Sequence, residues 1–273
     1  MLQGEKLVEL NVRDLISAFK LSGKSKLWQF LAQYPAKRLA HEMLEFDKTV
    51  EQRGIVEAGR FLLNRFSGSV TVSGAEKIPK FGPLIVASNH PGMMDAMALW
   101  TAIGREDIKI VAARRDLLDL LPNMRQRLIL IDPNSCRAFR EAASHLKSGG
   151  ALLTFPAGRI EPDVGVREGA IQSLANWSPS VISLKRRVEE ATVLPAFVYG
   201  VISKIAMKNP LLNSFKDQKE HDWAAATLQI LSPIYRRVGI HAAFGRPACT
   251  FDDLIAQMKC MIQNSEGELR SQS

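Results

Sequence analysis

Short apolar runs alternate with amphipathic stretches along most of the chain from residue 69 onward. Apolar, partly β-branched runs bounded by Gly, Pro or polar residues predict buried strands. These runs cover residues 69–73, 84–87, 108–112, 128–131, 151–155, 193–200 and 240–244. Between them, apolar residues recur at helical spacing, as in residues 94–103 and 139–146. The alternation predicts an α/β fold with a mainly parallel central sheet flanked by helices.

The first 66 residues differ from the rest because they contain helical patterns and no strand pattern. We expect an N-terminal helical region over residues 1–66, interrupted at Ser22-Gly23 and around Pro35. Residues 67–263 then form the main α/β domain. The charged and polar residues 264–273 predict a disordered tail.

Two segments of the helical region have different patterns. Near its end, Ile55, Leu62 and Phe66 belong to an apolar stripe, which indicates a helix that packs on the protein core. Residues 24–31 instead mix lysines with large apolar side chains, Trp28 among them. Two interpretations of this segment are open: it lies in the headgroup layer of an anionic membrane, or it packs on the parent domain with solvated lysines.

The composition of the chain indicates which kinds of binding partner and which place in the cell to expect. The net charge is +8 and the sequence pI is about 9.5, which favours an anionic partner such as a phosphate-bearing metabolite or an acidic lipid surface. The three cysteines form no CxxC pattern, so neither a disulfide framework nor a zinc site is indicated. The chain lacks an apolar run of membrane-spanning length and a signal-peptide pattern at its start. We expect a cytoplasmic protein, peripheral on the cytoplasmic face of the membrane.

A histidine and an aspartate mark the end of the second predicted strand. His90 follows that strand through a short turn, and Asp95 falls in the first turn of the next helix. Ligand crevices of open α/β sheets lie at the carboxyl ends of strands. A carboxylate at Asp95 suits the helix dipole, fixes one tautomer of His90 and stabilises its imidazolium. From these residues alone, the pair is either catalytic or a turn histidine beside a helix-start acid.

One glycine and several arginines flank other predicted strands. Gly158 and Arg159 follow residues 151–155, where glycine lets the backbone approach a ligand and arginine offers a fixed fork for phosphate or carboxylate. Arg114 and Arg115 follow another strand, and Arg127 precedes the next one. These residues are the candidate substrate-binding set, and the alternative for each arginine is a solvated surface charge.

Four sequence blocks, in this order, resemble the glycerolipid acyltransferase superfamily, whose best-known members are the 1-acyl-glycerol-3-phosphate acyltransferases. Residues 89–95, Asn-His-Pro-Gly-Met-Met-Asp, match the NHxxxxD block of that family. Residues 155–158 resemble its FPEG block, and residues 193–196 resemble its late apolar-proline block. Residues 114–132 occupy the place of its arginine-containing second block. The resemblance covers roughly residues 68–250.

The chain departs from the family pattern at three positions. Ala157 stands where the family usually has glutamate, and Arg159 falls one place earlier than the usual arginine. Pro133 follows the second block where arginine is common. Whether Glu161 replaces the missing carboxylate is open. Because the altered blocks are those that hold the acceptor in the family, the resemblance predicts the chemistry more firmly than the acceptor.

The resemblance implies an O-acyltransferase that moves an acyl group from a thioester, either acyl-CoA or acyl carrier protein, to the hydroxyl of a lipid acceptor. His90 would be the general base and Asp95 its orienting partner, with backbone donors near Gly158 for the oxyanion. Lysophospholipid, glycolipid and aminolipid acceptors are all open. No metal and no other cofactor is expected.

Two alternatives use the same scaffold differently. A catalytically silent lipid-binding protein would keep the fold without turnover, and a thioester hydrolase would use His90 to activate water. A nucleic-acid partner is not expected, because the basic residues are scattered without aromatic interleaving or a recognisable binding motif.

Overall fold

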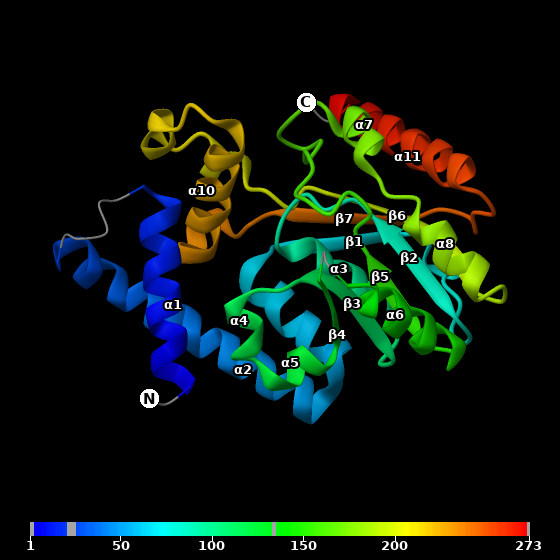
Figure 1. The fold of residues 1–273 in the computed structure, drawn as a ribbon. Helices are drawn as coiled ribbons and strands as arrows, with labels where there is room; N and C mark the ends of the chain where they lie inside the picture. The colour runs from blue at the N-terminus through cyan, green and yellow to red at the C-terminus, as the bar shows by residue number, and fades with distance from the viewer. Residues whose placement is uncertain (1–2, 21–25, 133–134, 272–273) are drawn as a thin grey trace.

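The structure, a computed structural model, describes residues 3–20, 26–132 and 135–271 (Figure 1). At its centre lies a seven-stranded sheet with the strand order β1-β7-β6-β2-β5-β3-β4. The strands are β1 (Ser69–Ser73), β2 (Leu84–Ser88), β3 (Ile108–Ala113), β4 (Leu128–Ile131), β5 (Ala151–Thr154), β6 (Thr192–Tyr199) and β7 (Gly239–Phe244). Among the described residues, every neighbouring pair is parallel except β6 and β7. The predicted α/β fold with a mainly parallel sheet is confirmed.

Helices cover both faces of the sheet (Figure 1). The α-helices are α1 (Gln3–Ala18), α2 (Lys26–Phe66), α3 (Met94–Ile103), α4 (Asp116–Asp119), α5 (Pro122–Gln126), α6 (Arg137–Lys147), α7 (Ala170–Ser173), α8 (Ser180–Arg187), α9 (Lys204–Met207), α10 (Gln218–Leu231) and α11 (Phe251–Ser271). Short 3₁₀ turns are η1 (Ala75–Lys77), η2 (Leu174–Asn176), η3 (Pro210–Ser214) and η4 (Pro233–Tyr235).

The alternation of side chains along each strand divides the core between the two faces. In β2, Leu84 and Val86 join a cluster formed with α2 and α3, whereas Ile85 and Ala87 join a cluster formed with α6, α8 and α11. All four side chains are fully buried. A strand buried on both faces is continuously apolar, as a central parallel strand must be.

The long helix α2 is interrupted at Gly54, whose φ of 85° and ψ of 172° are not helical. The segment from Ile55 therefore begins a new helix whose first amides have no intrahelical acceptor. The carboxylate of Glu106 fills this role, accepting from the amides of Ile55 at 2.8 Å and Val56 at 3.2 Å. A side chain on Gly54 would collide with that carboxylate.

Replacing Glu106 with alanine should lower the free energy of unfolding by about 1 kcal/mol, because two helix-start amides lose their capping acceptor. Urea denaturation measures this loss. Glu57→Ala is the matched control, since Glu57 forms a surface ion pair with Arg60 and should change stability little. Equal stability losses in the two variants would show that the Glu106 cap contributes nothing of its own.

Two expectations about the elements need correction, and a third cannot be compared with the described residues. No break occurs at Pro35: α2 continues through it, and the carbonyl that lacks its donor belongs to Leu31 in a solvent-exposed stretch. The tail predicted from residue 264 is instead helical to Ser271, because α11 continues with Ser265 buried. The predicted break at Ser22-Gly23 lies outside the described residues.

The strand β6 is central, although proline within a sheet is usually confined to an edge strand or a bulge. It lies between β2 and β7 in the sheet. The carbonyl of Pro195 accepts from the amide of Gly245, so the missing N–H of Pro195 faces the β7 side. Antiparallel pairing with β7 begins only at Ala196, so the proline removes no bond of that ladder.

Candidate active site

The sheet order brings several predicted site residues to one edge. The parallel strand β2 lies beside β5, and β5 lies beside β3. Their carboxyl ends therefore meet, so the turn at His90, the loop of residues 155–163 and the segment at Arg114-Arg115 are neighbours. This is the edge at which α/β sheets bind their ligands.

His90 and Asp95 form a direct pair. The Nδ1 atom of His90 lies 2.8 Å from Oδ2 of Asp95, and the same oxygen accepts from the Gly92 amide at 3.0 Å. The Asp95 side chain is fully buried, whereas 28% of the His90 side chain is exposed. The imidazole also stacks on Phe155, with ring centroids 4.5 Å apart. Asp95 is thus held out of solvent while His90 reaches the surface of the site.

The environment of His90 keeps it basic. Burial alone would lower the pKa of His90, but the charge and hydrogen bond of Asp95 and the charge of Glu161 raise it above its ordinary value, against a smaller opposing effect of Arg115. An ionised Asp95 only accepts hydrogen bonds, so it selects the tautomer with hydrogen on Nδ1. The Nε2 atom then carries the lone pair that can take a proton.

Asn89 has a role that sequence reasoning did not assign. Its side chain exchanges two hydrogen bonds of 2.8 Å with the main chain of Val198 in β6. The side-chain amide of Asn89 therefore replaces the backbone hydrogen bonds of one more residue pair between β2 and β6, at the point where the main chain leaves β2 toward His90. The sequence feature that could have drawn attention to Asn89 is its position directly before His90 in the NHxxxxD block.

Two buried carboxylates, also not assigned from the sequence, fix the loop that follows β5. Asp163 accepts from four backbone amides: those of Gly165, Gly200, Val201 and Ile202. It thereby joins the loop to the end of β6. Burial raises the pKa of Asp163, and these four hydrogen bonds act in the opposite direction. The second carboxylate, Glu161, contacts the main chain of His90.

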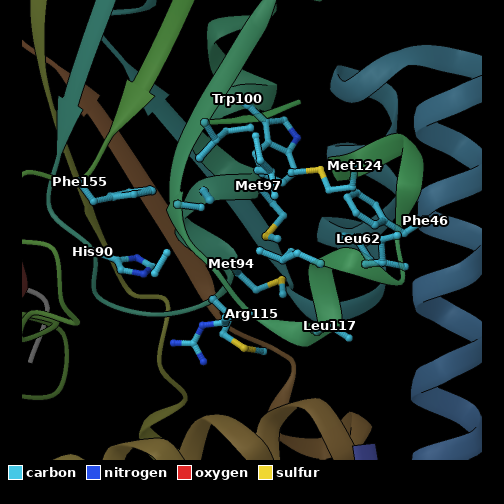
Figure 2. Close-up of a pocket in the computed structure, with 18 of the residues that line it drawn as sticks. Phe46, Leu62, His90, Met94, Met97, Trp100, Arg115, Leu117, Met124 and Phe155 are labelled. Carbon is cyan, nitrogen blue, oxygen red and sulfur yellow. The ribbon is translucent and has the colours of Figure 1, made fainter. Parts of the chain in front are cut away.

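An apolar cavity of about 400 Å³ begins at His90. Figure 2 shows His90 and Phe155 on one side of it, Met97 in its middle, and Trp100, Met124 and Phe46 toward the far side. Its walls come from α2, α3, β3, β4, α4 and α5. The methionines and leucines that line it suit a flexible hydrocarbon chain, because they adapt to its shape without polar contacts.

A second, more polar cavity of about 730 Å³ lies on the other side of the same turn. Pro91 and Gly92 form part of its wall, and α1, α7 and α10 also contribute residues. Met93, Arg159 and Ile160 line both cavities and so form the boundary between them. The site therefore joins an apolar space to a polar one beside the His90–Asp95 pair.

The structure separates the candidate substrate-binding residues into two groups. Gly158, Arg115 and Arg159 line the apolar cavity near His90. Arg114 is exposed and lies 3.4 Å from Asp119, outside both cavities.

Arg127 does not reach this edge of the sheet, although the sequence placed it in the substrate-binding set. It precedes β4 at the opposite edge and donates to the Glu106 carbonyl at 2.6 Å. Pro133, the departure noted in the second block, lies outside the described residues.

The backbone near Gly158 also differs from the expectation. The Gly158 amide donates to the Phe155 carbonyl at 3.0 Å, in a turn where Gly158 has a φ of 62°. This amide is therefore occupied. Within the described part of the chain, the amides of Arg159 and Ile160 have no such acceptor.

Comparisons with known proteins show what this chain is similar to. Residues 69–198, which include His90, Asp95 and Gly158, match the family model described as Acyltransferase. Among solved structures, the 1-acyl-sn-glycerophosphate (LPA) acyltransferase, PlsC, from Thermotoga maritima matches at 16% identity with a TM-score of 0.48, over 98% of this chain and 93% of that chain. Among curated protein sequences, none matches significantly. Over residues 69–198, this chain is therefore similar to the Acyltransferase family.

Proposed function

We propose that this protein transfers a fatty acyl group from an acyl thioester, acyl-CoA or acyl carrier protein, to the hydroxyl of a lysophospholipid or related lipid. The observation that carries this proposal is the His90–Asp95 pair at the junction of an apolar and a polar cavity. The pair supplies a base, and the apolar cavity supplies space for a hydrocarbon chain.

The reaction needs one proton acceptor and no covalent intermediate. Nε2 of His90 takes the proton of the acceptor hydroxyl as that oxygen attacks the thioester carbonyl carbon. The carbon–sulfur bond then breaks, and the leaving thiolate takes the proton from the His90 imidazolium. Asp95 stabilises the imidazolium between these two steps. The products are a new ester and a free thiol.

Charged and polar groups around His90 can bind the polar parts of the acyl donor and of the acceptor lipid. Arg115 and Arg159 line the apolar cavity and can hold a phosphate of the donor or of the acceptor. The amides of Arg159 and Ile160 are the backbone donors left for the tetrahedral oxyanion, since the Gly158 amide is occupied.

Product analysis tests this function. Purified protein is incubated with palmitoyl-CoA or palmitoyl carrier protein, with and without a panel of lysophospholipids, hydroxylated glycolipids and aminolipids, and the products are identified by mass spectrometry. A new ester that appears only with an acceptor supports the proposal. Free fatty acid formed equally with and without acceptor would indicate a hydrolase, and no turnover with any pair would indicate a lipid-binding protein.

The first turns of α2 support a membrane surface as the partner. Leu27, Trp28, Phe30, Leu31 and Tyr34 are large apolar side chains exposed to solvent, with Phe30 75% and Tyr34 77% exposed. Lysine and arginine side chains interleave with them on the same helix and are exposed too: Lys26, Lys37 and Arg38. Aromatic side chains among cations match the interface of an anionic bilayer.

The position of this segment links the membrane to the site. Leu39 and Met43, farther along α2, line the apolar cavity. The same helix therefore carries both the exposed aromatic segment and part of the cavity wall. Lys24, which the sequence placed in the same segment, lies outside the described residues. None of the helices in the described residues is long and apolar enough to cross a bilayer.

Replacing both Trp28 and Phe30 with serine should lower binding to vesicles that contain phosphatidylglycerol by about tenfold or more, because two buried aromatic rings contribute several kcal/mol at a lipid interface. Vesicle sedimentation measures the bound fraction. Ile205→Ser and Leu211→Ser together form the control, because these residues are also large, apolar and exposed but lie in α9 and η3. Unchanged binding of the Trp28 and Phe30 variant would exclude this surface.

A further inference from the structure

Glu161 contacts the main chain of His90, although it is 71 residues later in the chain. The Glu161 side chain is almost completely buried, with 3% of the residue exposed. Its Oε2 atom accepts from the His90 amide at 3.0 Å, and its own amide donates to the His90 carbonyl at 2.8 Å. Both main-chain groups of His90 are therefore bonded to one residue of the neighbouring loop.

The other oxygen of this carboxylate is held as firmly. Oε1 of Glu161 accepts from Oγ of Ser173 at 2.8 Å and from Nε1 of Trp177 at 2.9 Å. Trp177 is itself buried in the core on the α8 and α11 face of the sheet. The carboxylate is thus anchored to the core at one end and to His90 at the other.

Glu161 is the acidic side chain of this loop that reaches His90. Ala157 carries no charge, and its methyl group packs against the core on the α8 and α11 side. Asp163 turns toward the end of β6, where its oxygens accept from backbone amides.

We propose that Glu161 is a positioning residue for His90, whose carboxylate fixes the main chain that carries the imidazole and places a second negative charge behind it. This inference rests on the proposed function, in which His90 is the base. During the reaction the imidazole gains a proton, and two nearby carboxylates stabilise the resulting cation better than Asp95 alone.

The charges that face His90 come from three elements. Asp95 in α3 and Glu161 in the loop after β5 both raise the pKa of His90, and Arg115, which precedes α4, lowers it. Burial raises the pKa of Glu161 itself, and the hydrogen bonds from Trp177, Ser173 and the His90 amide act in the opposite direction by favouring the charged carboxylate. Removing that charge leaves Asp95 opposed by burial and by Arg115. The pKa of His90 should then fall.

The test compares Glu161→Gln with the wild-type protein. Glutamine keeps the shape, but its amide has one acceptor oxygen for donors on both sides, so either the His90 amide or the Ser173 and Trp177 donors face an NH₂ group. NMR titration of the His90 ring in the folded, substrate-free protein should show a lower pKa. The rate of ester formation should fall on the order of tenfold, with the acid limb of its pH profile moved to lower pH.

Two further variants separate positioning from general structural damage. Glu106→Gln removes a carboxylate that also accepts two backbone amides but lies away from His90, and it should leave both pH curves in place. Glu161→Asp keeps the charge and withdraws it from the His90 amide, so it should lower the rate with a smaller shift of the His90 pKa. If Glu161→Gln does not fold, this aspartate variant carries the test.

An unchanged His90 titration in Glu161→Gln, or the same shift in Glu106→Gln, would overturn the inference; if the glutamine variant does not fold, an unchanged rate in Glu161→Asp would do so. The titration requires no substrate, so it is independent of the proposed reaction. A protein that forms no ester but shows the His90 shift would contradict the proposed function and leave the placement of Glu161 intact.

Discussion

Asparagine in place of Asp95 should lower the rate of acyl transfer on the order of 10³–10⁴-fold. The substitution keeps the shape of a fully buried side chain and removes its charge. An asparagine NH₂ group facing Nδ1 favours the tautomer with hydrogen on Nε2, so the lone pair of His90 no longer faces the acceptor hydroxyl.

Steady-state kinetics at several pH values measure this effect. The pKa of His90 is raised in the wild-type protein, and a general base works only when it is neutral, so the wild-type rate should fall as the pH drops through that raised value. Without the charge of Asp95, the residual activity should persist to lower pH. Asp252→Asn, an exposed substitution at the start of α11, is the control. A loss of less than tenfold in Asp95→Asn would contradict the assigned role.

Tryptophan in place of Met97 should abolish most transfer of long acyl chains while short chains still react. Met97 lies in the middle of the apolar cavity, between His90 and Trp100 (Figure 2). A larger ring there fills part of a space of about 400 Å³ and closes the route to the far end. Excluding even a few methylene groups costs several kcal/mol, so the rate for a long-chain thioester should fall about 100-fold.

Competition between butyryl-CoA and palmitoyl-CoA measures this change of preference in one vessel. Met97→Leu is the matched control, because leucine nearly conserves the volume and should leave the preference unchanged. If Met97→Trp transfers both chains in the wild-type ratio, the acyl chain does not occupy this cavity.

Much of the fold follows from the sequence because the strands are short, apolar and separated by glycine or proline. The structure ends β2 at Ser88 and begins α3 at Met94, within a residue of the pattern. The helix ends at Gly104 in a left-handed conformation, which a glycine after the last apolar position predicts. These elements depend on local signals.

Other features depend on tertiary contacts that no local pattern contains. The break of α2 occurs at Gly54 because Glu106, far along the chain, caps the helix that restarts there. The last residues are helical because α11 packs along the sheet, where a polar composition alone predicted fraying. Propensity is overridden in each case by a partner distant in sequence.

Contacts between residues close in the sequence could be predicted from their spacing, whereas contacts that depend on the order of strands in the sheet could not. Five residues between a strand and a helix's first turn bring His90 and Asp95 together, so the pair was readable. The contact of Glu161 with His90 requires β2 and β5 to be neighbours, which a single sequence does not state. Arg127 precedes a strand of a sheet that the sequence predicts to be parallel, so its place at the edge opposite His90 already followed from that pattern.

The most direct measurement of the central claim is the rate of new ester formation by His90→Ala beside the wild-type protein, with a thioether analogue of palmitoyl-CoA as the binding probe. We expect a loss on the order of 10²–10⁴-fold in rate, with the variant folded and the probe bound as before. Ester formation at the wild-type rate without the imidazole would contradict it.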